Sequence, residues 1–310
     1  MNRSLRGRAY AVSTVWTLIL LYLGSVVHAT ESSLACPDWP TCFGTMVPEM
    51  SGGVFWEHLH RLVAGGLLLM WGLATFLTFR ETESGHRARA ATAVGMVLLL
   101  IQAGFGGLTV LMRLPDAIST AHLTMALLFL GLATALWVSS RTDWMSSAGI
   151  PEAFRRSYRV GTAHLVVLVL LQSMLGAYVR HADAGLACPD VPLCRGRLIP
   201  PMDSHLVGIH FGHRVLGVLI LGATIWVGIR VLRSVQGTLV RRLAAAAMAL
   251  VVVQVTLGFV SVLQMLAVVP VSLHSLVAAT LLATAVAMRV LGSAPIPTSG
   301  QQVPAEEGSP

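Results

Sequence analysis

Long apolar segments without a single Asp, Glu, Lys or Arg dominate this sequence and restrict what it can fold into. They cover residues 9–27, 62–79, 90–112, 117–140, 160–179, 215–229 and 243–288. A membrane-spanning helix needs about 20 mostly apolar residues. The segment 215–229 is short but extends back to Phe211, and 243–288 is long enough for two helices that divide near 263–270. We therefore predict an all-α polytopic membrane protein with eight transmembrane helices.

Composition supports this class and excludes others. Only 11% of the 310 residues are charged, whereas soluble domains carry about 25%, so a soluble enzyme and a disordered chain are both excluded. The net charge of +7 does not indicate a nucleic-acid partner, because the arginines form short clusters between apolar segments. Most of these clusters fall on one side of the predicted spans, and the positive-inside rule then places both termini in the cytoplasm.

A sequence repeat divides the chain into two halves. The nonapeptide LACPDWPTC at 34–42 recurs as LACPDVPLC at 186–194, an offset of 152 residues. We predict two tandem, pseudo-twofold-related four-helix bundles in the same orientation, at residues 1–144 and 158–292. A cytoplasmic linker at 145–157 joins them, and a flexible cytoplasmic tail at 293–310 follows.

Each predicted half contains two histidines at one depth near the outer membrane face. The offset aligns His122 with His274, and His60 aligns with His213 at a spacing of 153 residues. Two imidazoles from facing helices provide the axial ligands of a haem iron. Zinc is the main competing metal, but no third or fourth ligand recurs at that depth in both halves.

Charged neighbours of these histidines differ between the halves. Arg61 and Arg214 directly follow the first ligand of each pair, where each either binds a haem propionate or snorkels to the membrane surface. Glu57 precedes His60 by three residues, on the same helix face, and the matching residue of the second half is His210. A carboxylate is expensive in an apolar helix, so we expect one half to do chemistry and the other to transfer electrons.

All four cysteines lie in the two predicted outer loops, as the pairs Cys36/Cys42 and Cys188/Cys194. An extracytoplasmic location permits disulfide bonds. Structural disulfides are the favoured interpretation, and a redox-active pair or a metal site are the alternatives.

Together these residues resemble the haem A synthase family, in the bacterial form that has a cysteine pair in each half and acts in cytochrome oxidase assembly. The resemblance rests on the duplicated eight-helix layout, on Glu57-x-x-His60-Arg61, His122, His213-Arg214 and His274, and on both cysteine pairs. It covers about residues 9 to 291.

This resemblance implies an oxidoreductase that oxidises the C8 methyl group of haem O to the formyl group of haem A, through two successive hydroxylations. His60 and His122 would bind haem O in the first half, and His213 and His274 a permanent haem b in the second. Glu57 matches the essential acidic residue of the family. Cys36 and Cys42 match the pair implicated in function, whereas Cys188 and Cys194 match the pair read as structural.

The resemblance also implies partners and a location. These are a bacterial cell membrane, haem O synthase as the preceding enzyme, a quinone or another membrane electron acceptor, and, as an option, a second copy of the chain. Two other functions also account for the four histidines, namely a dihaem b-type electron-transfer cytochrome and a haem transporter or chaperone. The cytochrome alternative leaves Glu57 without a role.

Overall fold

The computed structural model describes residues 5–82 and 84–293, and they form eight long helices, one short helix and a 3-10 turn. The long helices are α1 (Leu5–Ala29), α2 (Gly52–Arg80), α3 (His86–Leu111), α4 (Asp116–Ser139), α6 (Glu152–His181), α7 (His205–Ser234), α8 (Thr238–Leu263) and α9 (Val268–Leu291). The short elements are α5 (Thr142–Ser146) and η1 (Ala184–Leu186). The predicted all-helical class and the division near 263–270 are confirmed.

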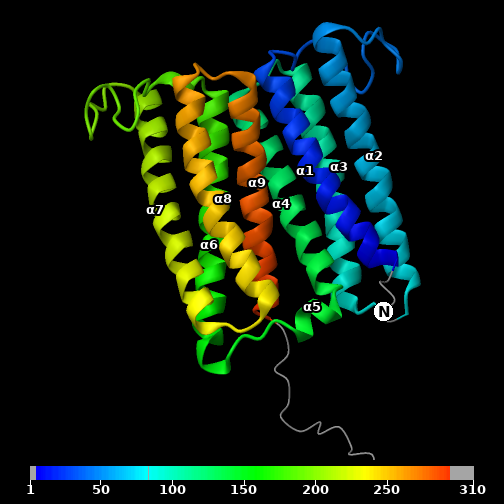
Figure 1. Ribbon diagram of the computed structural model, residues 1–310. Helices are drawn as coiled ribbons and strands as arrows, with labels where there is room; N and C mark the ends of the chain where they lie inside the picture. Colours follow the sequence, from blue (N-terminus) through cyan, green and yellow to red (C-terminus); the bar gives the residue numbers. More distant parts are fainter. Residues whose placement is uncertain (1–4, 83, 294–310) are drawn as a thin grey trace, which may run out of the picture.

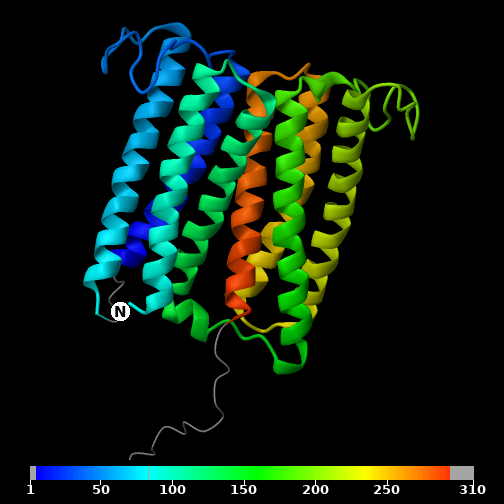
Figure 2. The same ribbon diagram turned by 180° about the vertical axis from the view of Figure 1, so that it is seen from behind.

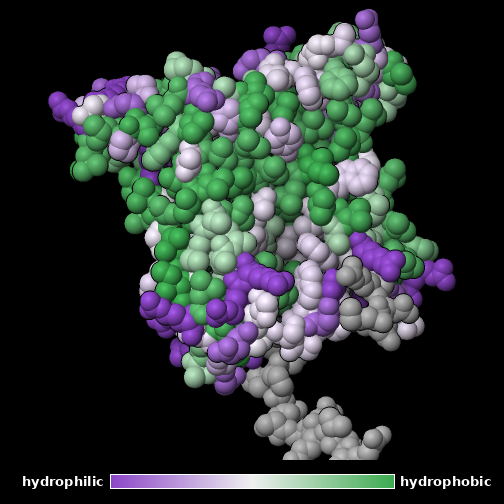
Figure 3. Space-filling view, viewed as in Figure 1, coloured by the Kyte–Doolittle hydropathy of each residue, from purple (hydrophilic) through white to green (hydrophobic). Residues whose placement is uncertain are grey.

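All eight long helices have the length and apolar composition of membrane spans. Their outward-facing residues include many large apolar side chains, such as Leu69, Phe76 and Leu219. In the space-filling view, hydrophobic residues form a broad band over the middle of the molecule, and hydrophilic residues gather towards its two ends (Figure 3). A lipid environment explains this distribution, because lipid tails are as apolar as the exposed side chains. The chain is a multi-pass membrane protein.

Contacts between helices repeat from one half to the other. The pairs α1·α2, α2·α3, α3·α4 and α1·α4 of the first half correspond to α6·α7, α7·α8, α8·α9 and α6·α9 of the second. Across the junction α4 packs on α9, while α1 contacts α9 and α4 contacts α6. Exchanging the halves leaves this pattern unchanged, as pseudo-twofold symmetry requires. The ribbon views show the two groups of helices side by side, with the long loops before α2 and α7 at opposite edges of one end (Figures 1 and 2).

The turn between the third and fourth spans of each half also repeats. Arg113 and Leu114 have φ values of 58° and 60°, and Met265 and Leu266, 152 residues later, have φ values of 51° and 63°. Two consecutive left-handed residues end the helix and reverse the chain without glycine. The same local structure therefore starts α4 and α9 at corresponding depths.

The segment between the halves is more helical than a linker. It contains α5, and α6 begins at Glu152 directly after Pro151, a residue that favours the start of a helix. The division into separate units at 1–144 and 158–292 stays a prediction. Of the predicted tail, residues 294–310 lie outside the described residues.

Candidate functional site

The four predicted ligands occupy corresponding places near the N-terminal ends of their helices. His60 is the ninth residue of α2 and His213 the ninth of α7, while His122 and His274 are the seventh residues of α4 and α9. These four helices all start at the end of the molecule that carries the two long loops. Each half therefore has two imidazoles at about the same depth, as the repeat predicts.

In the second half the two imidazoles lie close together. The ring centroids of His213 and His274 are 6.5 Å apart, with the ring planes at 65°. Two imidazoles that bind one metal ion through bonds of about 2 Å have centroids roughly 6 Å apart. The Nδ1 atoms of His60, His122 and His213 are buried without a hydrogen-bond partner among the described residues. The residues present thus fit a bis-histidine haem, which is held by one nitrogen of each ring.

Glutamines accompany these histidines. The Gln102 amide nitrogen lies 3.4 Å from His122 Nε2, and the Gln254 amide nitrogen lies 3.1 Å from His274 Nε2. In the second half only, Gln172 donates a 2.8 Å hydrogen bond to the backbone carbonyl of His213. The residue 152 positions before Gln172 is Leu20, so the surroundings of the first ligand are more apolar in the first half.

Glu57 joins α2 to the first outer loop. Glu57 is buried, with only 4% of the residue exposed. Oε1 forms a 2.5 Å ion pair with the Arg61 guanidinium, and Oε2 accepts a 2.8 Å hydrogen bond from the backbone N–H of Cys36. A buried carboxylate needs such partners to remain charged. Glu57 is therefore a fixed, paired carboxylate one turn from His60, and not a freely hydrated residue.

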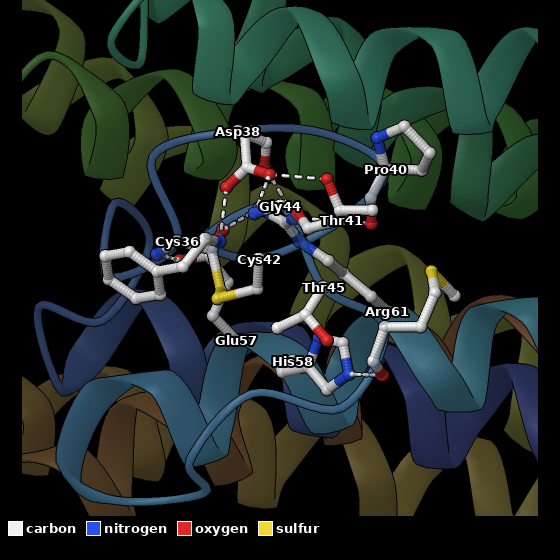
Figure 4. The surroundings of a disulfide bond; sticks show 12 residues. Cys36, Asp38, Pro40, Thr41, Cys42, Gly44, Thr45, Glu57, His58 and Arg61 are labelled. Carbon is white, nitrogen blue, oxygen red and sulfur yellow. Dashed lines mark hydrogen bonds and ion pairs between the residues drawn. A yellow bond between two sulfur atoms is a disulfide. The ribbon is translucent and has the colours of Figure 1, made fainter.

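The first outer loop is cross-linked and packed onto α2 (Figure 4). Cys36 and Cys42 form a disulfide. Between them, the Asp38 carboxylate accepts hydrogen bonds from the Thr41 hydroxyl and from the backbone N–H groups of Phe43 and Gly44. These bonds, chiefly those from Thr41 and Gly44, hold the pKa of Asp38 below its usual range. The loop is thus a small preformed structure and not an open strand.

The second outer loop repeats this design, but Leu193 replaces Thr41 and His210 replaces Glu57. Cys188 and Cys194 form the second disulfide, and the Asp190 carboxylate accepts from the N–H groups of Arg195 and Gly196. At the position of Glu57, His210 donates through Nδ1 to the Ala184 carbonyl at 2.8 Å and receives a 3.1 Å hydrogen bond from Arg214 Nε. An imidazole here replaces the carboxylate, so the sequence asymmetry persists in space.

Both arginines that follow the ligands hold these loops in place. Arg61 donates to the backbone carbonyls of Asp38 and Thr41, and Arg214 donates to those of Cys188, Asp190 and Leu193. Their guanidinium groups thus bind loop carbonyls, a function that neither the propionate interpretation nor the snorkelling interpretation anticipated. Propionate binding by Arg61 or Arg214 stays a prediction.

Comparison with known proteins identifies the family. Residues 49–286 match the family described as cytochrome oxidase assembly protein, COX15-CtaA. The matched region contains Glu57 and the four proposed ligand histidines. The chain belongs to this family.

Relatives in the family share most of the chain. The haem A synthase of Symbiobacterium thermophilum is 32% identical over 265 residues, which are 83% of this chain and 85% of the relative. The haem A synthase of Lysinibacillus sphaericus is 30% identical over 284 residues, which are 89% of this chain and 91% of the relative. The haem A synthase of Shewanella oneidensis is 24% identical over 291 residues, and the match covers 81% of this chain and 86% of the relative. The resemblance found in the sequence is confirmed.

Several residues of this family member have no role that the sequence alone assigns. His58 is buried, and its ligand atom lies within 4.8 Å of both Cys36 and Cys42 sulfurs. In the second half the corresponding residue is Phe211, which packs against the disulfide of that half. His28 and His181 meet at the junction of the halves with ring centroids 5.1 Å apart. They are 153 residues apart, the spacing that also relates His60 to His213, so they are corresponding residues of the two halves. The repeat thus pairs them, but only the docking of the halves shows that they meet.

Proposed function

We propose that this chain acts as a haem A synthase, an oxidoreductase that converts the C8 methyl group of haem O into the formyl group of haem A. The first half, with His60 and His122, binds haem O as substrate. The second half, with His213 and His274, holds haem b as a resident cofactor. Membership of the family, and relatives that are haem A synthases over most of their length, support this function.

The observation that carries this division of roles is the difference at one position. Glu57 in the first half is a carboxylate, and the corresponding residue His210 in the second half is an imidazole bound to a loop carbonyl. Both halves bring two histidines together, but only the first adds an anionic group one turn away. A proton acceptor is needed where C–H and O–H bonds break, and an electron-transfer site has no such need.

Glu57 has the position of a proton acceptor. Each hydroxylation of a methyl group by water removes two electrons and two protons, so that CH3 becomes CH2OH and then CH(OH)2, which loses water to give CHO. Glu57 accepts one of these protons, or stabilises positive charge that develops at the methyl carbon. Arg61 orients the carboxylate through the ion pair, and the Cys36 N–H fixes its second oxygen.

The second half serves electron removal. When bound, haem b supplies reversible one-electron transfer. His213 and His274 hold the iron, and Gln172 fixes the backbone of His213. Electrons leave to a quinone or another membrane acceptor, and haem O synthase supplies the substrate. Both termini lie on the cytoplasmic side, and both haem sites lie near the outer face.

A pyridine haemochrome spectrum of the purified protein, taken before and after incubation with haem O and an oxidant, tests this function. Haem A or its hydroxylated precursor beside haem B is the expected result. A dihaem electron-transfer cytochrome gives haem B alone from both halves, and a haem transporter or chaperone releases haem O unchanged. Either of those results would reject the synthase activity.

A further inference from the structure

All four proposed ligand histidines rest on a glycine of the neighbouring helix. His60 lies against Gly24 of α1, and His122 against Gly106 of α3. In the second half His213 lies against Gly176 of α6, and His274 against Gly258 of α8. The spacing between the corresponding glycines is 152 residues, the same as the sequence repeat. The first span of each half thus supports a histidine of the second, and the third span supports one of the fourth.

The contact has the same geometry in all four places. A β-carbon on Gly24, Gly106, Gly176 or Gly258 would lie 3.0, 3.1, 2.8 or 3.1 Å from the imidazole Cε1 atom. Nδ1 is the next nearest ring atom in each case, at 3.4 to 3.7 Å, and Nε2 is the farthest of the three, at 3.6 to 3.9 Å. A methyl group at Gly176 would force the ring to move, and at the other three glycines the ring would have to give way by a few tenths of an ångström. The same edge of every ring therefore faces a bare stretch of helix backbone.

At His274 this bare backbone supplies a hydrogen bond. His274 Nδ1 lies 3.0 Å from the backbone carbonyl of Gln254. Gln254 precedes Gly258 by four residues, so its carbonyl lies directly beside Gly258 on the helix surface. A side chain at 258 would cover this carbonyl. A metal-bound histidine usually donates its other N–H to a carbonyl or carboxylate, which fixes the tautomer and strengthens the ligand.

We propose that Gly24, Gly106, Gly176 and Gly258 are positioning residues for the four haem ligands. Each glycine lets the imidazole approach the neighbouring helix with its Cε1 edge, and this close contact fixes the place and orientation of the ring. Beside Gly258 the carbonyl of Gln254 also accepts a hydrogen bond from His274 Nδ1. This inference rests on the proposed function only for the identity of the haem, because it concerns ligation in each half and not the oxidation of the methyl group.

The test compares Gly258→Ala with Gly222→Ala in the purified, haem-loaded protein. Gly222 lies on α7, and a methyl group there would meet nothing within 4 Å, so alanine fits. We expect Gly258→Ala to change the low-spin spectrum of haem b and to raise its midpoint potential, because loss of the bond to Gln254 weakens electron donation by His274. Gly222→Ala leaves both unchanged. A wild-type spectrum and potential in Gly258→Ala would overturn the proposal.

If Gly258→Ala fails to fold, a second comparison still tests the proposal. It sets the thermal midpoint of His274→Ala against that of the double variant His274→Ala/Gly258→Ala. In the His274→Ala background there is no ring to collide with, and Gly258→Ala is then neutral or stabilising, as alanine is in an ordinary helix. A lower thermal midpoint in the double variant than in His274→Ala alone would also overturn the proposal. Gly106→Ala and Gly104→Ala provide the same comparison on α3, since a methyl group at 104 meets nothing within 4 Å.

These outcomes are separate from those of the proposed function. If the wild-type protein leaves haem O unchanged, the synthase activity fails, while the potentials of the second-half variants still decide the role of the glycines. If the potentials do not respond but haem A is formed, only the positioning role fails.

Discussion

The backbone N–H of Cys36 donates a 2.8 Å hydrogen bond to Oε2 of Glu57. This bond connects a disulfide-closed loop to the carboxylate next to the substrate ligand His60. Arg61 completes the connection, because it binds Oε1 of Glu57 and the loop carbonyl of Asp38. The loop, the carboxylate and the first turns of α2 thus form one cross-linked unit, and a substitution in any of them should alter the position of the others.

Removing the carboxylate should stop the oxidation but not haem binding. We expect Glu57→Gln to bind haem normally and to lower the rate of haem A formation by about 10²-fold or more, the usual contribution of a proton acceptor, with haem O or the alcohol accumulating. Chromatography of extracted haems measures this. The control is Glu49→Gln, an exposed glutamate of the same loop region. A normal haem A yield from Glu57→Gln would exclude the proposed role.

The two disulfides should differ in their effect on activity while having similar effects on stability. Each closes a loop with a sequence separation of 6, for which chain entropy gives about 2 kcal/mol. We therefore expect a similar fall in thermal midpoint for the double variants Cys36→Ser/Cys42→Ser and Cys188→Ser/Cys194→Ser. Only the first should also slow haem A formation, because only Cys36 holds Glu57. Equal losses of activity in both would contradict a special role for the first loop.

Much of this architecture is accessible from the sequence, and the reason is physical. Uncharged segments of membrane-spanning length identify helices without knowledge of their neighbours, and the repeat gives the correspondence of His122 with His274. The contacts of Arg61 with loop carbonyls, of His58 with the disulfide, and of Gly258 with His274 depend on how helices and loops pack. Contacts between distant segments have no local signature in the sequence. A glycine such as Gly258 does not reveal its contact either, because small residues are common at many helix interfaces in membranes.

The outer loops should keep their structure down to a low pH. Hydrogen bonds from Gly196 and Arg195 lower the pKa of Asp190 from its ordinary value. A lowered carboxyl pKa contributes stability above the unfolded value, and this contribution is lost as the pH falls through the folded value. Hydrogen-exchange protection of the Arg195 and Gly196 amides should therefore be constant from neutral pH down to about 4 and fall below it.

Substitution should reproduce that loss at neutral pH. Asp190→Asn should expose the second loop to trypsin at Arg195, while Asp38→Asn, the matching change in the first loop, should leave cleavage at Arg195 as in the wild type. If Asp190→Asn is as resistant as the wild type, the Asp190 carboxylate does not organise the loop.

Haem b should depend on the second pair of histidines alone. The ring centroids of His213 and His274 are 6.5 Å apart, so we expect both rings to bind one haem iron. His213→Ala or His274→Ala should therefore abolish the low-spin haem b signal in optical and electron paramagnetic resonance spectra. His60→Ala and His122→Ala should keep that signal and lose the binding of added haem O. His164→Ala is the control, because His164 lies on the exposed side of α6 with Nδ1 bonded to the Val160 carbonyl. An unchanged low-spin spectrum in His274→Ala would refute the ligand assignment, and loss of haem b from His60→Ala would show that the halves do not bind haem independently.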